Sequence, residues 1–351
     1  MISYFFFNTF IYIGILLFFM NFQNLAKIEP YQFYLDVAFS SAKTKGDLTR
    51  SSSFRDRITK SKVIEKEKIS AINKALTRQL TRVLDSFPYI DKLHPFYREL
   101  VNCTIDYDAT KKALGAVKWV AGKVDDFSEI TRKNIQRTQD LQKINVFRRE
   151  YYGRISSLLK QIKHEFIVLE ESRKVMKSYP NIKTSVFTAA IAGFPNIGKT
   201  TLLFKLTGSK PEIDTYAFTT KSINIGYFTD NSRKIQVLDT PGSLNRFNKM
   251  NNIEKQAFLA MKYCANLLIY VFDLTEPFPL EDQLQLYARI KSFNQPLLVY
   301  LSKTDILDKK VIADFRERHS DTITDIGELK QKILTASMNF SVLEENVGSE
   351  M

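Results

Sequence analysis

Residues 186–206 read VFTAAIAGFPNIGKTTLLFKL, an apolar run followed by a glycine-rich loop and a helix-favouring segment. The loop at 193–200 matches G-x-x-x-x-G-K-[ST] in the strand, loop and helix order that this pattern requires. Its glycines let backbone N–H groups wrap closely around phosphates, Lys199 reaches the β- and γ-phosphates, and Thr200 binds Mg²⁺. The predicted phosphate-binding set is Gly193, Asn196, Ile197, Gly198, Lys199, Thr200 and Thr201.

Two further segments predict the γ-phosphate and metal contacts. The run KIQVL ends in DTPG, residues 239–242, where Asp239 is placed to hold the metal and the Gly242 N–H to meet the γ-phosphate. Between the two motifs, YAFTT at 216–220 supplies Thr219 and Thr220, and the sequence leaves open which of them closes on Mg²⁺. These residues predict a switch that depends on the third phosphate. The predicted catalytic residues are Lys199, Thr219, Thr220 and Gly242, and the predicted metal ligands are Thr200, Thr219, Thr220 and Asp239.

Base choice is predicted from SKTD at 302–305, which follows the apolar run LLVYL. An Asp305 carboxylate accepts hydrogen bonds from the ring N–H and amino group of guanine, a pair that adenine does not donate. Lys303 lays its aliphatic stem along the base. The segment TAS, residues Thr335, Ala336 and Ser337, is expected to follow the last strand and to offer the Ala336 N–H to the guanine oxygen. The order of the motifs favours GTP and GDP over adenine nucleotides.

The pattern of apolar residues predicts two domains. Short apolar runs alternate with helical segments in the second half, which indicates an α/β domain at 183–351 with a mostly parallel sheet flanked by helices; the runs lie at 186–192, 223–228, 235–238, 267–272, 297–301 and 333–334. Residues 27–180 instead show apolar stripes at helical spacing, typical of an antiparallel all-α bundle. The stripes are Ile69, Ile72, Leu76, Leu80, Val83, Leu84 and Phe87; Leu114, Val117, Val120, Val124, Phe127 and Ile130; and Ile155, Leu158, Leu159, Ile162, Phe166 and Leu169.

Composition narrows the function classes. The 351 residues are 44% apolar and 25% charged, as in globular proteins, and two cysteines with three scattered histidines build neither a disulfide framework nor a zinc cluster. The net charge is +13, and residues 27–182 hold 31 basic and 19 acidic side chains. The basic excess therefore belongs to the helical half, where a nucleic acid would bind through its phosphates.

Residues 1–26 carry no charged side chain. One interpretation is a membrane segment, since about 20 apolar residues span a bilayer. Another is a misassigned start, with translation beginning at Met20. We favour the second, because the resemblance described next begins just after Met20.

GFPNIGKT, YAFTTKS, DTPG and the helical segment DSFPYIDKLHPFYREL at 85–100 resemble the nucleolar GTP-binding protein 1 family, within the Obg-related GTPases. The resemblance covers roughly residues 22–340, and its extent implies a short member of the archaeal type, without the long extension of the eukaryotic members. It implies a GTPase of large ribosomal subunit assembly that is cytoplasmic and ribosome-associated, with rRNA and ribosomal proteins of the subunit or its precursor as partners.

Two departures from the family pattern affect the expected chemistry. The base-specificity motif starts with Ser302 where asparagine is usual, so its tie to the phosphate loop is weaker. Ser243 and Leu244 follow DTPG, without the glutamine that orients water in Ras-like enzymes, so slow intrinsic hydrolysis is expected. A potassium ion held by Asn196 is one hypothesis for the missing positive charge. The alternatives are a membrane-anchored GTPase and a nucleotide-regulated binding module with negligible hydrolysis.

Overall fold

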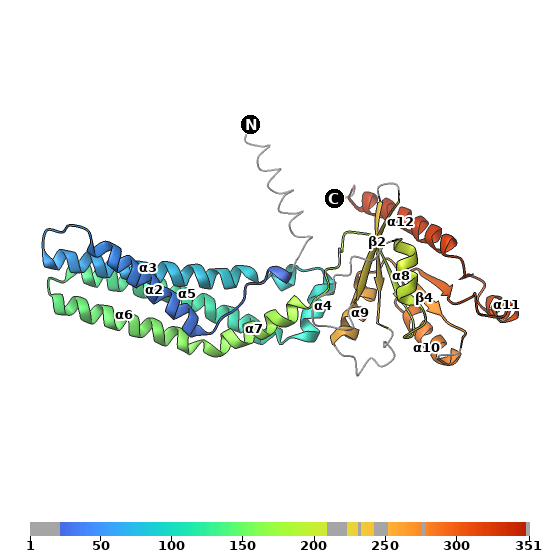
Figure 1. The fold of residues 1–351 in the computed structure, drawn as a ribbon, viewed down its shortest axis with the longest axis horizontal. Coiled ribbons are helices and arrows are strands. Elements are labelled where there is room, and N and C mark those ends of the chain that lie inside the picture. The colour runs from blue at the N-terminus through green and yellow to red at the C-terminus, as the bar shows by residue number, and fades with distance from the viewer. Residues whose placement is uncertain (1–21, 209–222, 231–232, 242–251, 276–277, 349–351) are drawn as a thin grey trace, which may run out of the picture. The chain divides into compact units, whose positions relative to one another are not determined.

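The computed structural model describes residues 22–208, 223–230, 233–241, 252–275 and 278–348, which fall into two compact units (Figure 1). One unit is helical and comprises residues 22–91 and 104–177. The other comprises the described residues of 92–103 and 178–348 and contains the sheet. No helix among the described residues has the length and apolarity needed to cross a membrane.

The helical unit is an antiparallel bundle (Figure 1). A 3₁₀ turn at Phe22–Asn24 precedes α2 (Tyr31–Arg50), α3 (Arg57–Ser86), α5 (Tyr107–Arg137), α6 (Leu141–Gln161) and α7 (Lys163–Lys177). α3 packs against α2 and α5, and α5 also packs against α6 and α7. Aspartate side chains cap three of the helices: Asp56, Asp106 and Asp140 accept hydrogen bonds from the first-turn N–H groups of Thr59, Ala109 and Gln142.

Most residues of the predicted stripes lie in the core of this bundle, whereas Leu84, Leu114 and Phe127 are only half-buried. Ile69, Ile72, Leu76 and Leu80 are fully buried, as apolar residues at three- and four-residue spacing are when one helix face packs inward. Ile130 is instead 50% exposed. The third stripe is shared by two helices, because α6 ends at Gln161 and α7 begins at Lys163.

The sheet unit has six strands in the order β2-β3-β1-β4-β5-β6. They are β1 (Thr188–Ala192), β2 (Asn224–Asp230), β3 (Arg233–Asp239), β4 (Leu267–Phe272), β5 (Leu297–Leu301) and β6 (Thr322–Ile323). Only the β2–β3 pair is antiparallel, so the predicted mostly parallel sheet is confirmed. The central strands β1 and β4 are buried at every residue, as parallel strands covered on both faces are.

The helices of this unit are α4 (Pro95–Thr104, grouped with the sheet up to Cys103), α8 (Lys199–Thr207), α9 (Asn252–Tyr263), α10 (Leu280–Lys291), α11 (Lys309–Arg318) and α12 (Ile326–Gly348). Tyr97 of α4 accepts a hydrogen bond from the N–H of Ile182 (3.0 Å), which fixes this helix to the segment entering the sheet. The prediction of a strand at 333–334 is wrong. Those residues lie inside α12, and the sixth strand is β6, whose two residues pair with β5.

Candidate nucleotide site

The site lies at the edge of the sheet where its parallel strands end, the usual position for ligands in open α/β sheets. The phosphate loop leaves β1, Asp239 ends β3, Asp273 follows β4, Ser302 follows β5, and Thr324 follows β6. Because β3, β1, β4, β5 and β6 are neighbours and parallel, this topology brings together residues that are far apart in sequence.

The phosphate loop has the backbone geometry that its glycines permit. Gly193 has φ of +143° and Gly198 has φ of +92°, both in the region that L side chains rarely adopt. A Cβ atom at Gly193 would lie 2.8 Å from the carbonyl oxygen of Val271. Asn196 also has a positive φ, 59°, and is exposed. The turn from β1 into α8 therefore depends on the residue types of the predicted motif.

Lys199 is buried at the first turn of α8, with 7% of its surface exposed. Its Nζ donates to the carbonyl oxygen of Phe194 (2.5 Å), across the loop. Burial lowers the pKa of Lys199 to about 8, and the nearby Asp239 carboxylate only partly offsets this. A buried ammonium group with little compensating charge is suited to bind the negative charge of a polyphosphate.

Thr200 and Asp239 form the predicted metal site. Thr200 Oγ1 donates to Asp239 Oδ2 (2.6 Å), and Asn224 Nδ2 donates to the same oxygen (3.0 Å). The other oxygen, Asp239 Oδ1, is buried and has no hydrogen-bond partner among the described residues. A carboxylate and a hydroxyl are the ligand types that Mg²⁺ prefers, and an unpaired buried oxygen is stabilised by a cation, so these residues fit the metal.

Asn224 was not predicted from the sequence. It lies directly opposite Asp239 in the antiparallel β2–β3 register. The pairing register, which the sequence does not reveal, is what brings it to the site. Thr240 fixes the end of β3 against β1. Its Oγ1 and its N–H both donate to the carbonyl oxygen of Ile191 (2.8 and 3.2 Å).

The base-specificity motif follows β5. Ser302 is buried and donates through Oγ to the carbonyl oxygen of Phe272 (3.0 Å), while Asp305 is exposed and free to accept hydrogen bonds from a ligand. Lys303 has a positive φ of 53° and pairs through Nζ with Asp273 Oδ2 (2.5 Å). Burial raises the pKa of Tyr300 in β5, and the negative charges of Asp325 and Asp305 raise it further.

The predicted role of 335–337 is wrong. Thr335, Ala336 and Ser337 lie in the interior of α12, where helical backbone N–H groups donate to the carbonyl four residues earlier. The turn that does follow the last strand is Thr324 and Asp325. Asp325 Oδ2 accepts from the N–H of Glu328 (2.8 Å) and so caps α12. The predicted residues Thr219, Thr220 and Gly242 lie outside the described residues.

Family matches cover both units of the chain. Residues 22–183 match the NOG1 N-terminal helical domain, and residues 188–303 match the 50S ribosome-binding GTPase. Nucleolar GTP-binding protein 1 of Candida glabrata is 28% identical over 333 residues, 93% of this chain and 50% of its own. The chain belongs to the nucleolar GTP-binding protein 1 family. The resemblance predicted from the motifs is thereby confirmed, and the sheet unit is a P-loop GTPase domain.

Other family relatives and neighbours differ in coverage. The uncharacterised protein MJ1408 of Methanocaldococcus jannaschii is 37% identical over 257 residues, 72% of each chain. This member spans about half the length of the nucleolar relatives that it matches. Among solved structures, the G domain of the T. maritima FeoB iron transporter is similar, with 26% identity, a TM-score of 0.36, and coverage of 43% of this chain and 99% of that one.

Proposed function

We propose that this chain binds GTP with Mg²⁺, hydrolyses it slowly, and acts as a switch in assembly of the large ribosomal subunit, with its helical unit docking on rRNA. The observation that carries the nucleotide part is the arrangement of Lys199, Thr200 and Asp239 at the end of the phosphate loop. Names of the relatives support a guanine nucleotide and, with the 50S ribosome-binding GTPase match, a ribosomal context.

Each of the described site residues has a distinct role in the proposed binding and hydrolysis of GTP. Lys199 neutralises charge on the β- and γ-phosphates, and its burial makes that attraction stronger than in water. Thr200 and Asp239 would hold Mg²⁺, which supplies positive charge to the phosphates. Asp305 selects guanine, and the turn at 324–325, rather than 335–337, borders the base. Ser243 and Leu244, rather than a glutamine, directly follow DTPG in the sequence, so water is poorly oriented and intrinsic turnover is slow.

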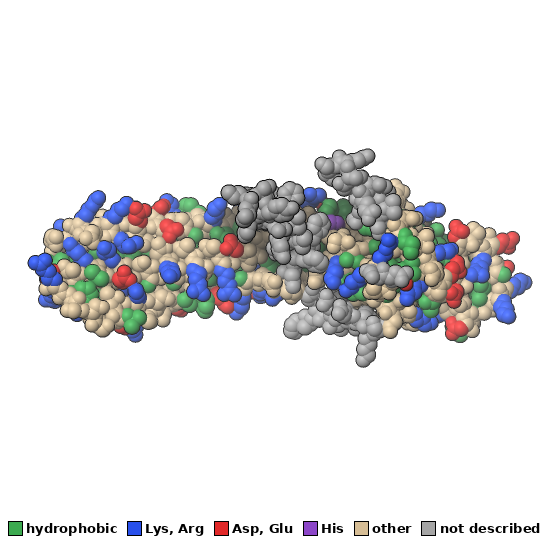
Figure 2. Space-filling view, turned by 90° about the horizontal axis from the view of Figure 1, so that it is seen from above, with side chains coloured by type: hydrophobic (Ala, Val, Ile, Leu, Met, Phe, Trp, Pro, Cys, Tyr) green, Lys and Arg blue, Asp and Glu red, His purple; other side chains and the backbone are tan. Residues whose placement is uncertain are grey.

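The RNA part of the proposal rests on the charge of the helical unit. Figure 2 shows Lys and Arg side chains spread along the visible face of this unit with fewer Asp and Glu side chains among them. Lys and Arg bind the phosphate backbone whatever its sequence, and release of counterions makes such binding weaken as salt rises. We therefore expect binding to ribosomal particles to be salt-sensitive and to depend on the helical unit.

Co-sedimentation with large-subunit particles tests the docking. The chain should pellet more strongly with a non-hydrolysable GTP analogue than with GDP, and less at moderate than at low salt. A charge-reversal variant of the exposed pair Lys111 and Lys112 on α5 should pellet less, whereas the same reversal of the exposed pair Lys309 and Lys310 on α11 should not. Equal pelleting by all three proteins contradicts docking through the helical unit.

A single-turnover assay with GTP, with and without the particles, tests hydrolysis. Slow phosphate release that the particles accelerate supports the switch. Release that stays at the uncatalysed rate in both conditions would show a nucleotide-regulated binding module instead. Repeating the assay in potassium and sodium buffers tests the role of Asn196, since equal rates in the two buffers exclude a specific potassium site.

A further inference from the structure

We propose that Asp273 is a positioning residue for base recognition: its buried carboxylate holds Lys303 in place and so replaces the tie that asparagine at position 302 gives related GTPases. This inference rests on the proposed binding of guanine nucleotides. It adds a residue outside the recognised motifs, in the turn that follows β4.

The carboxylate of Asp273 is fully buried and engaged on both oxygens. Oδ2 pairs with Lys303 Nζ (2.5 Å), and Oδ1 accepts from the N–H (2.9 Å) and Oγ1 (2.6 Å) of Thr275. Burial alone would raise the pKa of Asp273, but Lys303 and Thr275 outweigh it and hold the pKa below its usual value. The group is therefore a buried anion at neutral pH whose charge partner is a residue of the base-specificity motif.

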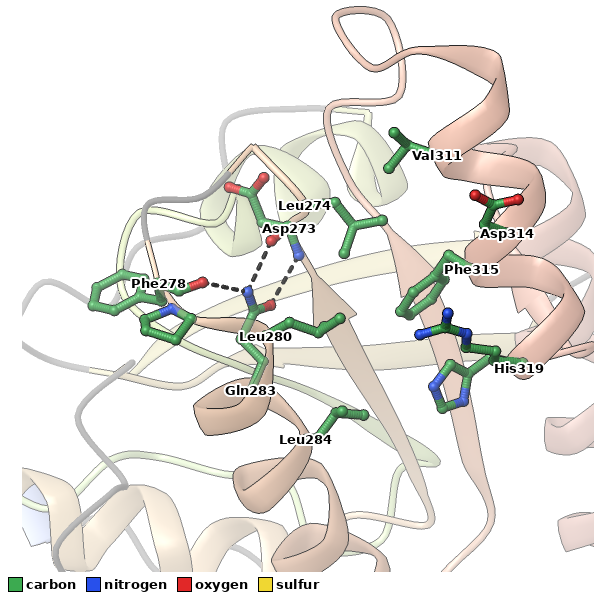
Figure 3. Close-up of a pocket in the computed structure, with 12 residues that line it drawn as sticks. Asp273, Leu274, Phe278, Leu280, Gln283, Leu284, Val311, Asp314, Phe315 and His319 are labelled. Carbon is green, nitrogen blue, oxygen red and sulfur yellow. Dashed lines mark hydrogen bonds between the residues drawn. The ribbon is translucent and has the colours of Figure 1, made fainter.

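The backbone of Asp273 is fixed from the other side by Gln283 of α10 (Figure 3). Gln283 Oε1 accepts from the Asp273 N–H (3.0 Å), and its Nε2 donates to the carbonyl oxygens of Asp273 (2.8 Å) and Phe278 (3.1 Å). Gln283 is 1% exposed, and it lines a cavity of about 530 Å³ together with residues of α10 and α11. In Figure 3 the Asp273 carboxylate points away from this amide, which leaves it available to Lys303.

Ser302 explains why such a tie is needed. Its Oγ donates to the carbonyl oxygen of Phe272, on the neighbouring strand, rather than to the phosphate loop. Yet the loop is adjacent, because a Cβ atom at Gly198 would lie 3.8 Å from Ser302 Cβ. A longer side chain at this position would reach the loop, whereas serine does not.

Both the backbone and the ammonium group of Lys303 must be held in place by neighbouring residues. Its φ of 53° is uncommon for a residue with a side chain, and such backbone persists when the surroundings hold it. The ion pair with Asp273 fixes the far end of the side chain, while 34% of the side-chain surface stays accessible to a ligand. The stem is thus held in one orientation, ready to lie along a base.

Titration of fluorescent GDP and GTP into Asp273→Asn tests this role. The Kd should rise about tenfold for both nucleotides, the range of coupling between contacting residues, while kcat at saturating GTP stays unchanged because the phosphate side is untouched. Asp314→Asn removes an exposed carboxylate that lines the same cavity and should bind as the wild type does. Adding Ser302→Asn to Asp273→Asn should restore most of the affinity, which a merely structural loss would not allow.

Lys303→Met is the second variant, used where Asp273→Asn fails to fold. It keeps the aliphatic stem and removes the ammonium group, so its Kd should rise by the same factor as that of Asp273→Asn. The double variant that combines Asp273→Asn with Lys303→Met should bind no more weakly than either single variant. Wild-type affinity in either single variant, or additive losses in the double variant, would overturn the role of Asp273. If the wild type binds GDP no better than ADP, the proposed function itself fails and this role fails with it.

Discussion

Raising the pH should weaken nucleotide binding through a single group, Lys199. Burial lowers the pKa of this lysine to about 8. Bound phosphates favour the ammonium form, so a complex formed above pH 8 must take up a proton that the free protein has released. The bound state then carries more protons than the free state, and affinity falls as pH rises through the free-state pKa.

The size of the effect follows from that pKa. At pH 7 about a tenth of the free protein has neutral Lys199, and at pH 9 about nine-tenths has. If the bound lysine returns to its ordinary pKa of 10.5, Kd rises about tenfold between pH 7 and pH 9, or about 1.4 kcal/mol. The window ends at pH 9 so that the ring N–H of guanine stays largely protonated.

Isothermal titration with GDP and Mg²⁺ at several pH values measures this slope. Two buffers of different ionisation enthalpy at pH 9 should report uptake of close to one proton. Lys199→Met should bind weakly with little dependence on pH. Lys205→Met, which removes an exposed lysine from the same helix, should keep the wild-type slope. A flat wild-type profile, or an unchanged slope in Lys199→Met, would refute the assignment to this buried lysine.

Three further outcomes follow from the structure. Asp239→Asn should abolish most of the difference between GDP affinity measured with Mg²⁺ and with EDTA, because the unpaired buried oxygen is the expected metal ligand; an unchanged difference would place the metal elsewhere. Gly193→Ala should lower the unfolding free energy by about 1–3 kcal/mol in urea denaturation, through a strained φ and a backbone clash, whereas Gly208→Ala, with φ of 68° and open space around it, should cost about 1 kcal/mol. Leu76→Ala should destabilise the bundle by about 2–5 kcal/mol, against about 0.5 kcal/mol or less for alanine at the half-exposed Trp119, and similar melting temperatures for the two variants would contradict the assigned core.

The sequence predicts those parts of the molecule in which chemistry or periodicity is local. The phosphate loop is contiguous, so the order of its glycines and Lys199 along the chain is enough to identify it. β4 and β5 match the apolar runs at 267–272 and 297–301, because a strand segment that is buried on both faces, as all of β4 and the last three residues of β5 are, consists of consecutive apolar residues. The prediction that Ile130 lies in the core is wrong, because the buried face of the long helix α5 shifts gradually around its axis. Ser128 and Ile135 face inward in its place.

The errors and omissions arise where pairing across the sheet decides the structure. β6 has two residues and no apolar run of its own, and its ladder with β5 is a long-range interaction. The apolar pair at 333–334 is part of an amphipathic helix, and a short run cannot by itself distinguish the two. Asn224 and Asp273 reach the site through register and through a side-chain pair, neither of which leaves a local motif.

The two lysines of the site, Lys199 and Lys303, differ in how far a neighbouring carboxylate compensates their charge. This difference assigns Lys199 to the phosphates of a nucleotide and Lys303 to its base. Lys199 has a lowered pKa and only partial compensation from Asp239, so its charge is stabilised most by an incoming anion. Lys303 is already neutralised by a buried carboxylate, so it attracts phosphate little and presents mainly its aliphatic stem. Affinity for the phosphates should therefore vary with pH between 7 and 9, while selection of the base should not. A GDP-to-ADP affinity ratio that stays constant across that range, as Kd itself rises, is the result that this division of roles requires.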